Sequence, residues 1–181
     1  MSESGTLTPP VSARDHAEGR ADAPVTLVEY GDYQCPYCGA AYPVVKQLQR
    51  TLGKRLRFVF RNFPLTEAHP YALVAAEAAE AAALQGKFWE MHDLIYENQA
   101  DLEPGILPAW AEKVGLDLVK FGDAIKKGEI NKRIREDRLS GIRSGVNGTP
   151  SFFINGTRHD GMPDYESLLA ALEEELLDTE S

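Results

Sequence analysis

The only two cysteines of the chain, Cys35 and Cys38, lie three residues apart in the run Cys-Pro-Tyr-Cys. Two thiols at this spacing can cycle between a dithiol and a disulfide when one sulfur is a thiolate and a partner can approach it. At the start of a helix, the exposed backbone N–H groups favour the thiolate and lower the pKa of Cys35. Cys38 would then lie one turn deeper on the same helix face, within reach of a disulfide. The pair therefore predicts thiol–disulfide exchange, with Cys35 attacking and Cys38 resolving.

A further candidate side chain is Glu29, which interrupts an apolar run just before the cysteines. Burial disfavours the charged form of a carboxyl group, so the pKa of Glu29 should be raised. Such a carboxylate could accept the proton of Cys38, directly or through a water. The alternative is that Glu29 faces solvent at the end of its strand.

Two other interpretations of the cysteines remain open from the residues alone. A structural zinc site needs four ligands, usually two such pairs. The four histidines are scattered along the chain, at His16, His69, His92 and His159. We therefore predict no metal site, and no cofactor is expected. The other interpretation is a redox sensor, in which the disulfide changes a partner surface without turnover.

The elements around the cysteines must bring them to the start of a helix. Residues 25–30 form an apolar run that predicts a buried strand. Residues 40–52 carry apolar side chains at helical spacing, and Pro43 should kink that helix. Residues 55–61 predict a second strand, parallel to the first. Strand, helix and strand together make one right-handed βαβ unit.

The remaining elements follow a long segment without strands. Residues 67–144 predict a helical insertion, which is too long for a simple crossover. Within it, His92 flanks an apolar helix face and is expected to be a core histidine. Residues 151–159 predict a hairpin with a primed turn, and Asp164 should cap a closing helix.

The composition indicates one globular domain with an insertion. The chain has 181 residues, of which 43% are hydrophobic and 26% are charged, as is ordinary for a globular protein. Its net charge of −9 argues against nucleic acid as a partner, because phosphate binding needs a basic surface. We expect a flexible arm at residues 1–23, one domain formed by residues 24–66 and 145–178, and the helical insertion at residues 67–144.

The sequence also leads to an expected location. No run approaches the roughly 20 apolar residues of a membrane span, so no span is expected. The first ten residues lack the basic start and apolar core of a secretory signal. We therefore expect a cytoplasmic protein, in a compartment where structural disulfides are rare. There a reductase, or a role in oxidative-stress repair, would be favoured.

The order β-α-β, helical block and β-β-α resembles the α/β thioredoxin fold with its mixed central sheet. Two motifs strengthen the resemblance, Cys35-Pro-Tyr-Cys38 and Gly145-Val-Asn-Gly-Thr-Pro150. Together with the inserted helices, they are similar to the DsbA-like branch of thiol–disulfide oxidoreductases. The resemblance covers residues 25–177 and implies that residues 24–66 and 145–178 form a thioredoxin-like domain.

The resemblance implies roles for further residues. Pro150 would be a cis-proline facing the disulfide, and Thr149 would present its backbone to a substrate chain. Pro36 and Tyr37 would lie on the substrate side of the cysteines, and Tyr37 stands where the commonest DsbA proteins have a histidine. Cys35 would be an exposed thiol and Cys38 a buried one. Glu29 matches a buried acid of the family.

The resemblance also implies the partners. Substrates would be protein or peptide thiols and disulfides. A redox partner is required, but the sequence does not say whether it is a reductase, glutathione or an oxidase. A glutathione-linked isomerase or transferase of related fold is an alternative, although such enzymes usually have a serine at the active position. The direction of electron flow is not determined by these residues.

Overall fold

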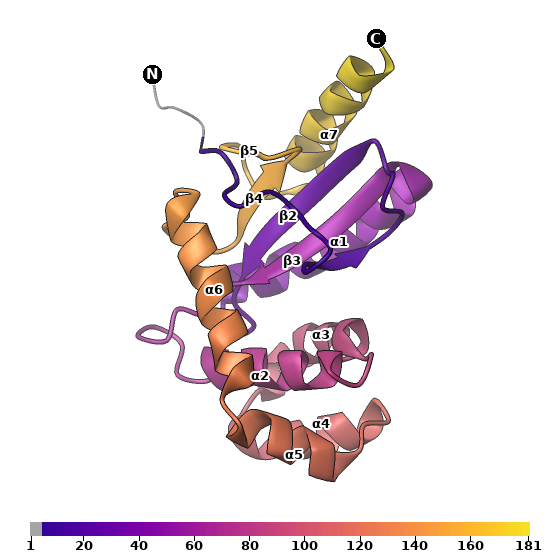
Figure 1. Ribbon diagram of the computed structural model, residues 1–181. Coiled ribbons are helices and arrows are strands. Elements are labelled where there is room, and N and C mark those ends of the chain that lie inside the picture. Colours follow the sequence, from indigo (N-terminus) through magenta and orange to yellow (C-terminus); the bar gives the residue numbers. More distant parts are fainter. Residues whose placement is uncertain (1–4) are drawn as a thin grey trace. The chain divides into compact units, whose positions relative to one another are not determined.

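The computed structural model describes residues 5–181, which form five strands and seven α-helices in two compact units (Figure 1). The sheet unit contains the described residues up to Gly31, together with Ala40–Arg61 and Leu139–Ser181. The helical unit contains Asp32–Gly39 and Asn62–Arg138. The cysteines therefore belong to the helical unit.

The sheet unit is built on one five-stranded sheet. Its strands are β1 (His16–Glu18), β2 (Val25–Gly31), β3 (Leu56–Asn62), β4 (Ser151–Ile154) and β5 (Thr157–Arg158). They lie in the order β1-β3-β2-β4-β5. The pairs β1–β3, β2–β4 and β4–β5 are antiparallel. Because the sheet is mixed, β2 and β3 are the parallel pair, and the predicted βαβ unit is confirmed.

Two long helices accompany this sheet, α1 (Pro36–Leu52) and α7 (Tyr165–Glu180). The helix α1 continues through Pro43 and is followed by the 3-10 turn η1 (Gly53–Arg55). The helix α7 packs against β2 and β4. Its first turn is capped as predicted, because the Asp164 carboxylate accepts the N–H of Ser167 at 2.8 Å.

The hairpin also forms as predicted. Asn155 and Gly156 both have positive φ, 46° and 86°, which a primed two-residue turn requires. In the antiparallel pair β2–β4, Tyr30 lies opposite Ser151 and Glu29 opposite Phe152. This register places Pro150, the residue before Ser151, at the end of β2, level with Gly31.

The expectation of a flexible arm at residues 1–23 is wrong for residues 5–23; residues 1–4 lie outside the described part. Strand β1 pairs with β3, and Leu7 is buried. The buried guanidinium of Arg61 is the physical reason. It donates to the Asp15 carboxylate at 2.8 Å and to the Pro9 carbonyl at 3.0 Å. A buried arginine needs such acceptors, and this segment supplies them.

The helical unit contains α2 (Ala72–Ala83), α3 (Phe88–Glu97), α4 (Leu107–Lys113), α5 (Leu118–Lys126) and most of α6 (Glu129–Arg143), with 3-10 turns η2 (Gln99–Asp101) and η3 (Pro104–Ile106). Most residues of α2 are buried alanines. Their small side chains let α3 and α5 approach closely, and both helices pack against α2. Among residues 5–181, no helix has the length and apolarity needed to cross a membrane.

The boundaries of the two compact units differ from the expected domain boundaries. Residues 32–39, which carry both cysteines, group with the helices rather than with the sheet. The first turn of α1 therefore belongs to the helical unit and the remainder of α1 to the sheet unit. The reason lies in the side chains that hold this segment, described next.

Candidate active site

Cys35 is the residue immediately before α1, and Cys38 lies in its first turn. The Gly39 N–H donates to the Cys35 carbonyl at 3.0 Å, which closes the first turn around the pair. The Cys38 sulfur accepts the Asp32 N–H at 3.5 Å. Both cysteines thus lie at a helix start, as predicted. Cys35 is only 3% exposed and Cys38 is 0% exposed, so the expectation that Cys35 would be an exposed thiol is wrong.

A buried carboxylate, that of Asp32, organises the loop before the cysteines. Its Oδ1 accepts the N–H groups of Gln34 at 2.8 Å and Cys35 at 3.2 Å. Its Oδ2 accepts the Leu65 N–H at 2.9 Å and lies 2.8 Å from Nδ1 of His69. This carboxylate therefore joins the cysteine loop to the segment that follows β3.

The side-chain amide of Gln99, a residue much later in the sequence, also holds this loop. Its Nε2 donates to the carbonyls of Tyr33 at 2.8 Å and Cys35 at 2.9 Å. Gly39 makes room for this contact, because a β-carbon at position 39 would collide with the Gln99 amide. A side chain from η2 thus fixes the backbone of Cys35.

Two further contacts complete the attachment of the loop. The Tyr33 hydroxyl lies 2.9 Å from Nδ1 of His92, and both residues are buried. The expectation that His92 is a core histidine is therefore confirmed. The Gln34 side chain accepts the Tyr71 N–H at 2.6 Å. Between the cysteines, the Tyr37 side chain is 73% exposed and therefore accessible to another molecule.

The other predicted site residues lie in the sheet unit. Glu29 is buried, with 2% of its surface exposed, so the alternative of a solvent-facing Glu29 is wrong. The Thr149–Pro150 peptide bond is cis, the geometry that the family resemblance implies. The strand register brings Glu29 and the start of β4 to the same end of the sheet. The predicted residues thus form two groups, one in each unit.

Sequence reasoning missed Asp32, His69 and Gln99. Asp32 had a local signal. An aspartate just before a helix often accepts the exposed backbone N–H groups two and three residues further along the chain. His69 and Gln99 had none, since their partners lie more than 30 positions away along the chain. Only folding brings them to the cysteine loop.

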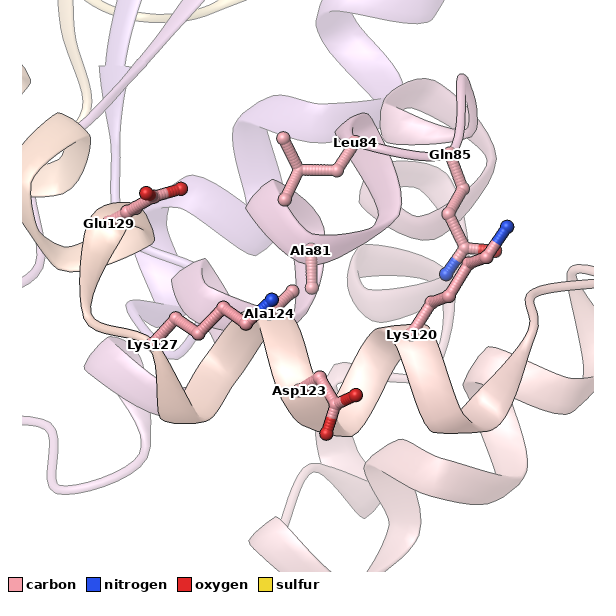
Figure 2. A pocket seen from close by; sticks show the side chains of 8 residues that line it. All are labelled: Ala81, Leu84, Gln85, Lys120, Asp123, Ala124, Lys127 and Glu129. Carbon is pink, nitrogen blue, oxygen red and sulfur yellow. The ribbon is translucent and has the colours of Figure 1, made fainter.

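Other features of the described residues offer no competing site. Within residues 5–181, no group of three His, Cys, Asp or Glu side chains could hold a metal ion. A hollow of about 240 Å³ is lined by residues in and next to α2, α5 and the start of α6, and Figure 2 shows their side chains. Its lining combines Lys120 and Lys127 with Asp123 and Glu129 and includes neither cysteine.

Comparisons with known proteins agree with this architecture. The Thioredoxin family model matches residues 12–174. The oxidised BdbD of Bacillus subtilis is 25% identical, with a TM-score of 0.84 over 96% of this chain and 97% of that chain. The thiol-disulfide exchange protein alpha-DsbA2 of Wolbachia pipientis is also 25% identical, with a TM-score of 0.78 over 90% of this chain and 87% of that one.

Curated relatives with higher identity are much longer proteins. The Na(+)/H(+) antiporter NhaA 1 of Salinispora arenicola is 51% identical over 159 residues, which are 88% of this chain and 24% of the relative. The Na(+)/H(+) antiporter NhaA 1 of Mycobacterium sp. (strain KMS) is 43% identical over 93% of this chain and 28% of its own length. The chain thus spans about a quarter of the length of these relatives.

The sheet order, the helical unit and the paired cysteines define a thioredoxin fold with inserted helices. The chain belongs to the DsbA-like family of thioredoxin-fold proteins. Membership supports a protein of the thiol–disulfide oxidoreductase kind.

The expected cytoplasmic location is wrong. The chain is structurally similar to DsbA-family thiol-disulfide exchange proteins, and this similarity indicates an extracytoplasmic location. The expectation rested on the first ten residues and on the lack of a long apolar run. Disulfides form and persist in oxidising compartments outside the cytoplasm. The expected role as a reductase or in oxidative-stress repair rested on the cytoplasmic location, so it is no longer favoured.

Proposed function

We propose that the chain catalyses thiol–disulfide exchange on protein substrates through Cys35 and Cys38. The observation that carries the proposal is the position of both cysteines at the start of α1, in a chain of the DsbA-like family. The exposed N–H groups of a helix start stabilise a thiolate at Cys35. The Asp32 N–H, 3.5 Å from the Cys38 sulfur, can stabilise negative charge on the second sulfur.

The exchange proceeds in two displacement steps. A substrate thiolate attacks the Cys35 sulfur of the Cys35–Cys38 disulfide, a bond forms between substrate and Cys35, and Cys38 leaves as a thiolate. A second substrate thiolate then attacks the substrate sulfur of this mixed disulfide, and Cys35 leaves as a thiolate. The substrate loses two electrons and two protons, and the cysteine pair gains them. Run backwards, the same steps reduce a substrate disulfide.

The extracytoplasmic location favours the oxidising direction. In that direction an external disulfide-bearing oxidant must regenerate the Cys35–Cys38 disulfide after each cycle.

The remaining predicted residues receive supporting roles. Thr149 presents its backbone to the substrate chain, and Pro150, which has no N–H, leaves that approach open. Tyr37 and Pro36 contact the substrate beside the cysteines, and the exposure of Tyr37 supports this role. Glu29 accepts the proton of Cys38, and its burial at the end of β2 supports this role because burial favours proton uptake by a carboxylate.

The test compares the wild-type protein with Cys35→Ser and Cys38→Ser, which are matched single-atom replacements. The wild type should oxidise a reduced peptide and reduce insulin well above the background of a small thiol. Cys35→Ser should fall to that background. Cys38→Ser should accumulate a mixed disulfide with the substrate, visible by mass spectrometry, because the resolving sulfur is missing.

An alternative function, the redox sensor, gives different results in the same experiment. A sensor would show a partner that binds in one redox state only, with no turnover above background. Turnover that is unchanged in Cys35→Ser would contradict the proposed mechanism. Antiporter activity is not proposed, because the match covers only 24% of the Salinispora relative.

A further inference from the structure

The four hydrogen bonds of Asp32 place a buried charge beside the cysteine pair. The Asp32 side chain is 0% exposed and the His69 side chain is 21% exposed. Three of the groups that donate to the Asp32 carboxylate are the backbone N–H groups of Gln34, Cys35 and Leu65. A backbone N–H can only donate, so the carboxylate serves all three as acceptor. The fourth contact is Nδ1 of His69 at 2.8 Å.

Asp32 touches both cysteines, each in a different way. Its carboxylate accepts the N–H of Cys35, one of the groups that a helix start would otherwise offer to a thiolate. Its backbone N–H donates toward the sulfur of Cys38. The side chain therefore brings negative charge to Cys35, and the main chain brings a donor to Cys38.

His69 is the side chain that can balance this charge. A protonated imidazole is a cation, and a cation 2.8 Å from Oδ2 offsets the charge of the carboxylate. Both groups lie within the helical unit, as do the cysteines. Removing Asp32 and removing His69 should therefore change the charge beside the thiols in opposite directions.

We propose that Asp32 and His69 are positioning residues that set how strongly the cysteine pair oxidises its substrates. The negative charge of Asp32 disfavours the Cys35 thiolate, and His69 limits that effect. The inference rests on the proposed function, because it concerns the same dithiol. Since a more stable thiolate favours the reduced form, removing the charge makes the pair a stronger oxidant, and removing its partner makes the pair a weaker one.

The experiment measures the Cys35 thiolate by its ultraviolet absorbance as a function of pH, and the dithiol–disulfide equilibrium against glutathione. Asp32→Asn keeps the shape of the side chain and removes its charge. It should lower the Cys35 pKa by about one unit, which is a tenfold shift of the thiolate equilibrium, and move the glutathione equilibrium toward the reduced form. His69→Asn keeps an N–H donor near the Nδ1 position and removes the possible positive charge. It should shift both readouts the other way.

Two matched substitutions serve as controls. Asp117→Asn removes another helix-capping carboxylate of the helical unit, which accepts the Lys120 N–H at 3.0 Å. His159→Asn removes a histidine of the sheet unit. Both controls should leave the Cys35 titration and the glutathione equilibrium unchanged.

The inference is overturned if Asp32→Asn titrates like the wild type, or if Asp32→Asn and His69→Asn shift the equilibrium in the same direction. The second outcome would indicate a structural role only, because loosening of the loop would shift the equilibrium in the same direction in both variants. The proposed function fails separately, when the wild type shows no exchange above background. The thiolate titration needs no turnover and therefore still decides the inference in that case.

Discussion

At the scale of single residues, two side chains hold the backbone of Cys35. Gln99 donates to the carbonyls of Tyr33 and Cys35, while Asp32 accepts the N–H of Cys35. The loop is thus held by a donor on one side and an acceptor on the other. A carboxylate at position 99 could not make these two bonds, because it has no hydrogen to donate.

Replacing Gln99 by glutamate should therefore remove both hydrogen bonds and bring an anion against two carbonyl oxygens. We expect a loss of about 1–3 kcal/mol in the free energy of unfolding and a slower reaction of Cys35 with a thiol reagent or substrate. Denaturant unfolding and alkylation kinetics measure the two effects. Gln85→Glu is the matched control, because Gln85 also bonds to backbone groups within the helical unit. A Gln85→Glu protein whose Cys35 reacts as slowly as that of Gln99→Glu would contradict this role.

At the scale of elements, a buried polar cluster ties α2 and α6 to the end of β3. The Asn62 amide donates to Glu80 at 2.8 Å and to Asp137 at 3.0 Å, and Arg133 lies 3.3 Å from Glu80. Burial raises the pKa of Asp137 from 3.8 to about 6, although hydrogen bonds from Asn62 and the charge of Arg133 oppose the shift. The carboxylate of α6 is thus costly to ionise in the folded state.

This cluster predicts a pH-dependent stability. Between pH 3.8 and about 6, the folded state binds more protons at Asp137 than the unfolded chain, so stability falls as the pH rises. Asp137→Asn removes that dependence. Its stability relative to the wild type should increase from pH 4 to pH 7 by an amount on the order of 2 kcal/mol. Unfolding curves across this range test the prediction, with the exposed Asp101→Asn as control. A difference that stays constant with pH would refute it.

At the scale of the whole molecule, the redox state should change the stability of the fold. If the chain is an oxidant, folding must favour the dithiol over the disulfide, because the potential measures the relative stability of the two forms. The helix start at Cys35 stabilises a thiolate, which only the reduced protein contains. A protein that oxidises its substrates is therefore also a protein whose reduced form is more stable than its oxidised form.

We expect the reduced protein to unfold at higher denaturant concentration than the oxidised protein. The difference should be at least about 1 kcal/mol, since about 30 mV of potential corresponds to 1.4 kcal/mol. Equilibrium unfolding with and without a reductant measures it. The double substitution Cys35→Ser and Cys38→Ser should show no difference between the two conditions. If the oxidised protein is the more stable form, the chain is a reductant and the oxidising direction is wrong.

Much of the fold could be predicted because its signals are local. Apolar periodicity predicted β2, β3 and the helices, and Asn155-Gly156 and Asp164 predicted a turn and a cap that both form. Residues 5–23 have no such period, yet they pack. Their order comes from strand pairing with β3 and from the acceptors they supply to Arg61. A composition rich in polar residues does not reveal a buried partner elsewhere in the chain.

The sequence by itself determined that a pair of thiols lies at the start of a helix, which follows from spacing and helix geometry over a few residues. The tertiary structure alone decided how that pair is held. His69 and Gln99 reach the cysteine loop from segments far along the chain, where His69 contacts Asp32 and Gln99 donates to the Cys35 carbonyl. Hydrogen bonds of buried polar groups depend on which distant segments meet, and the spacing of residues along the chain does not encode that.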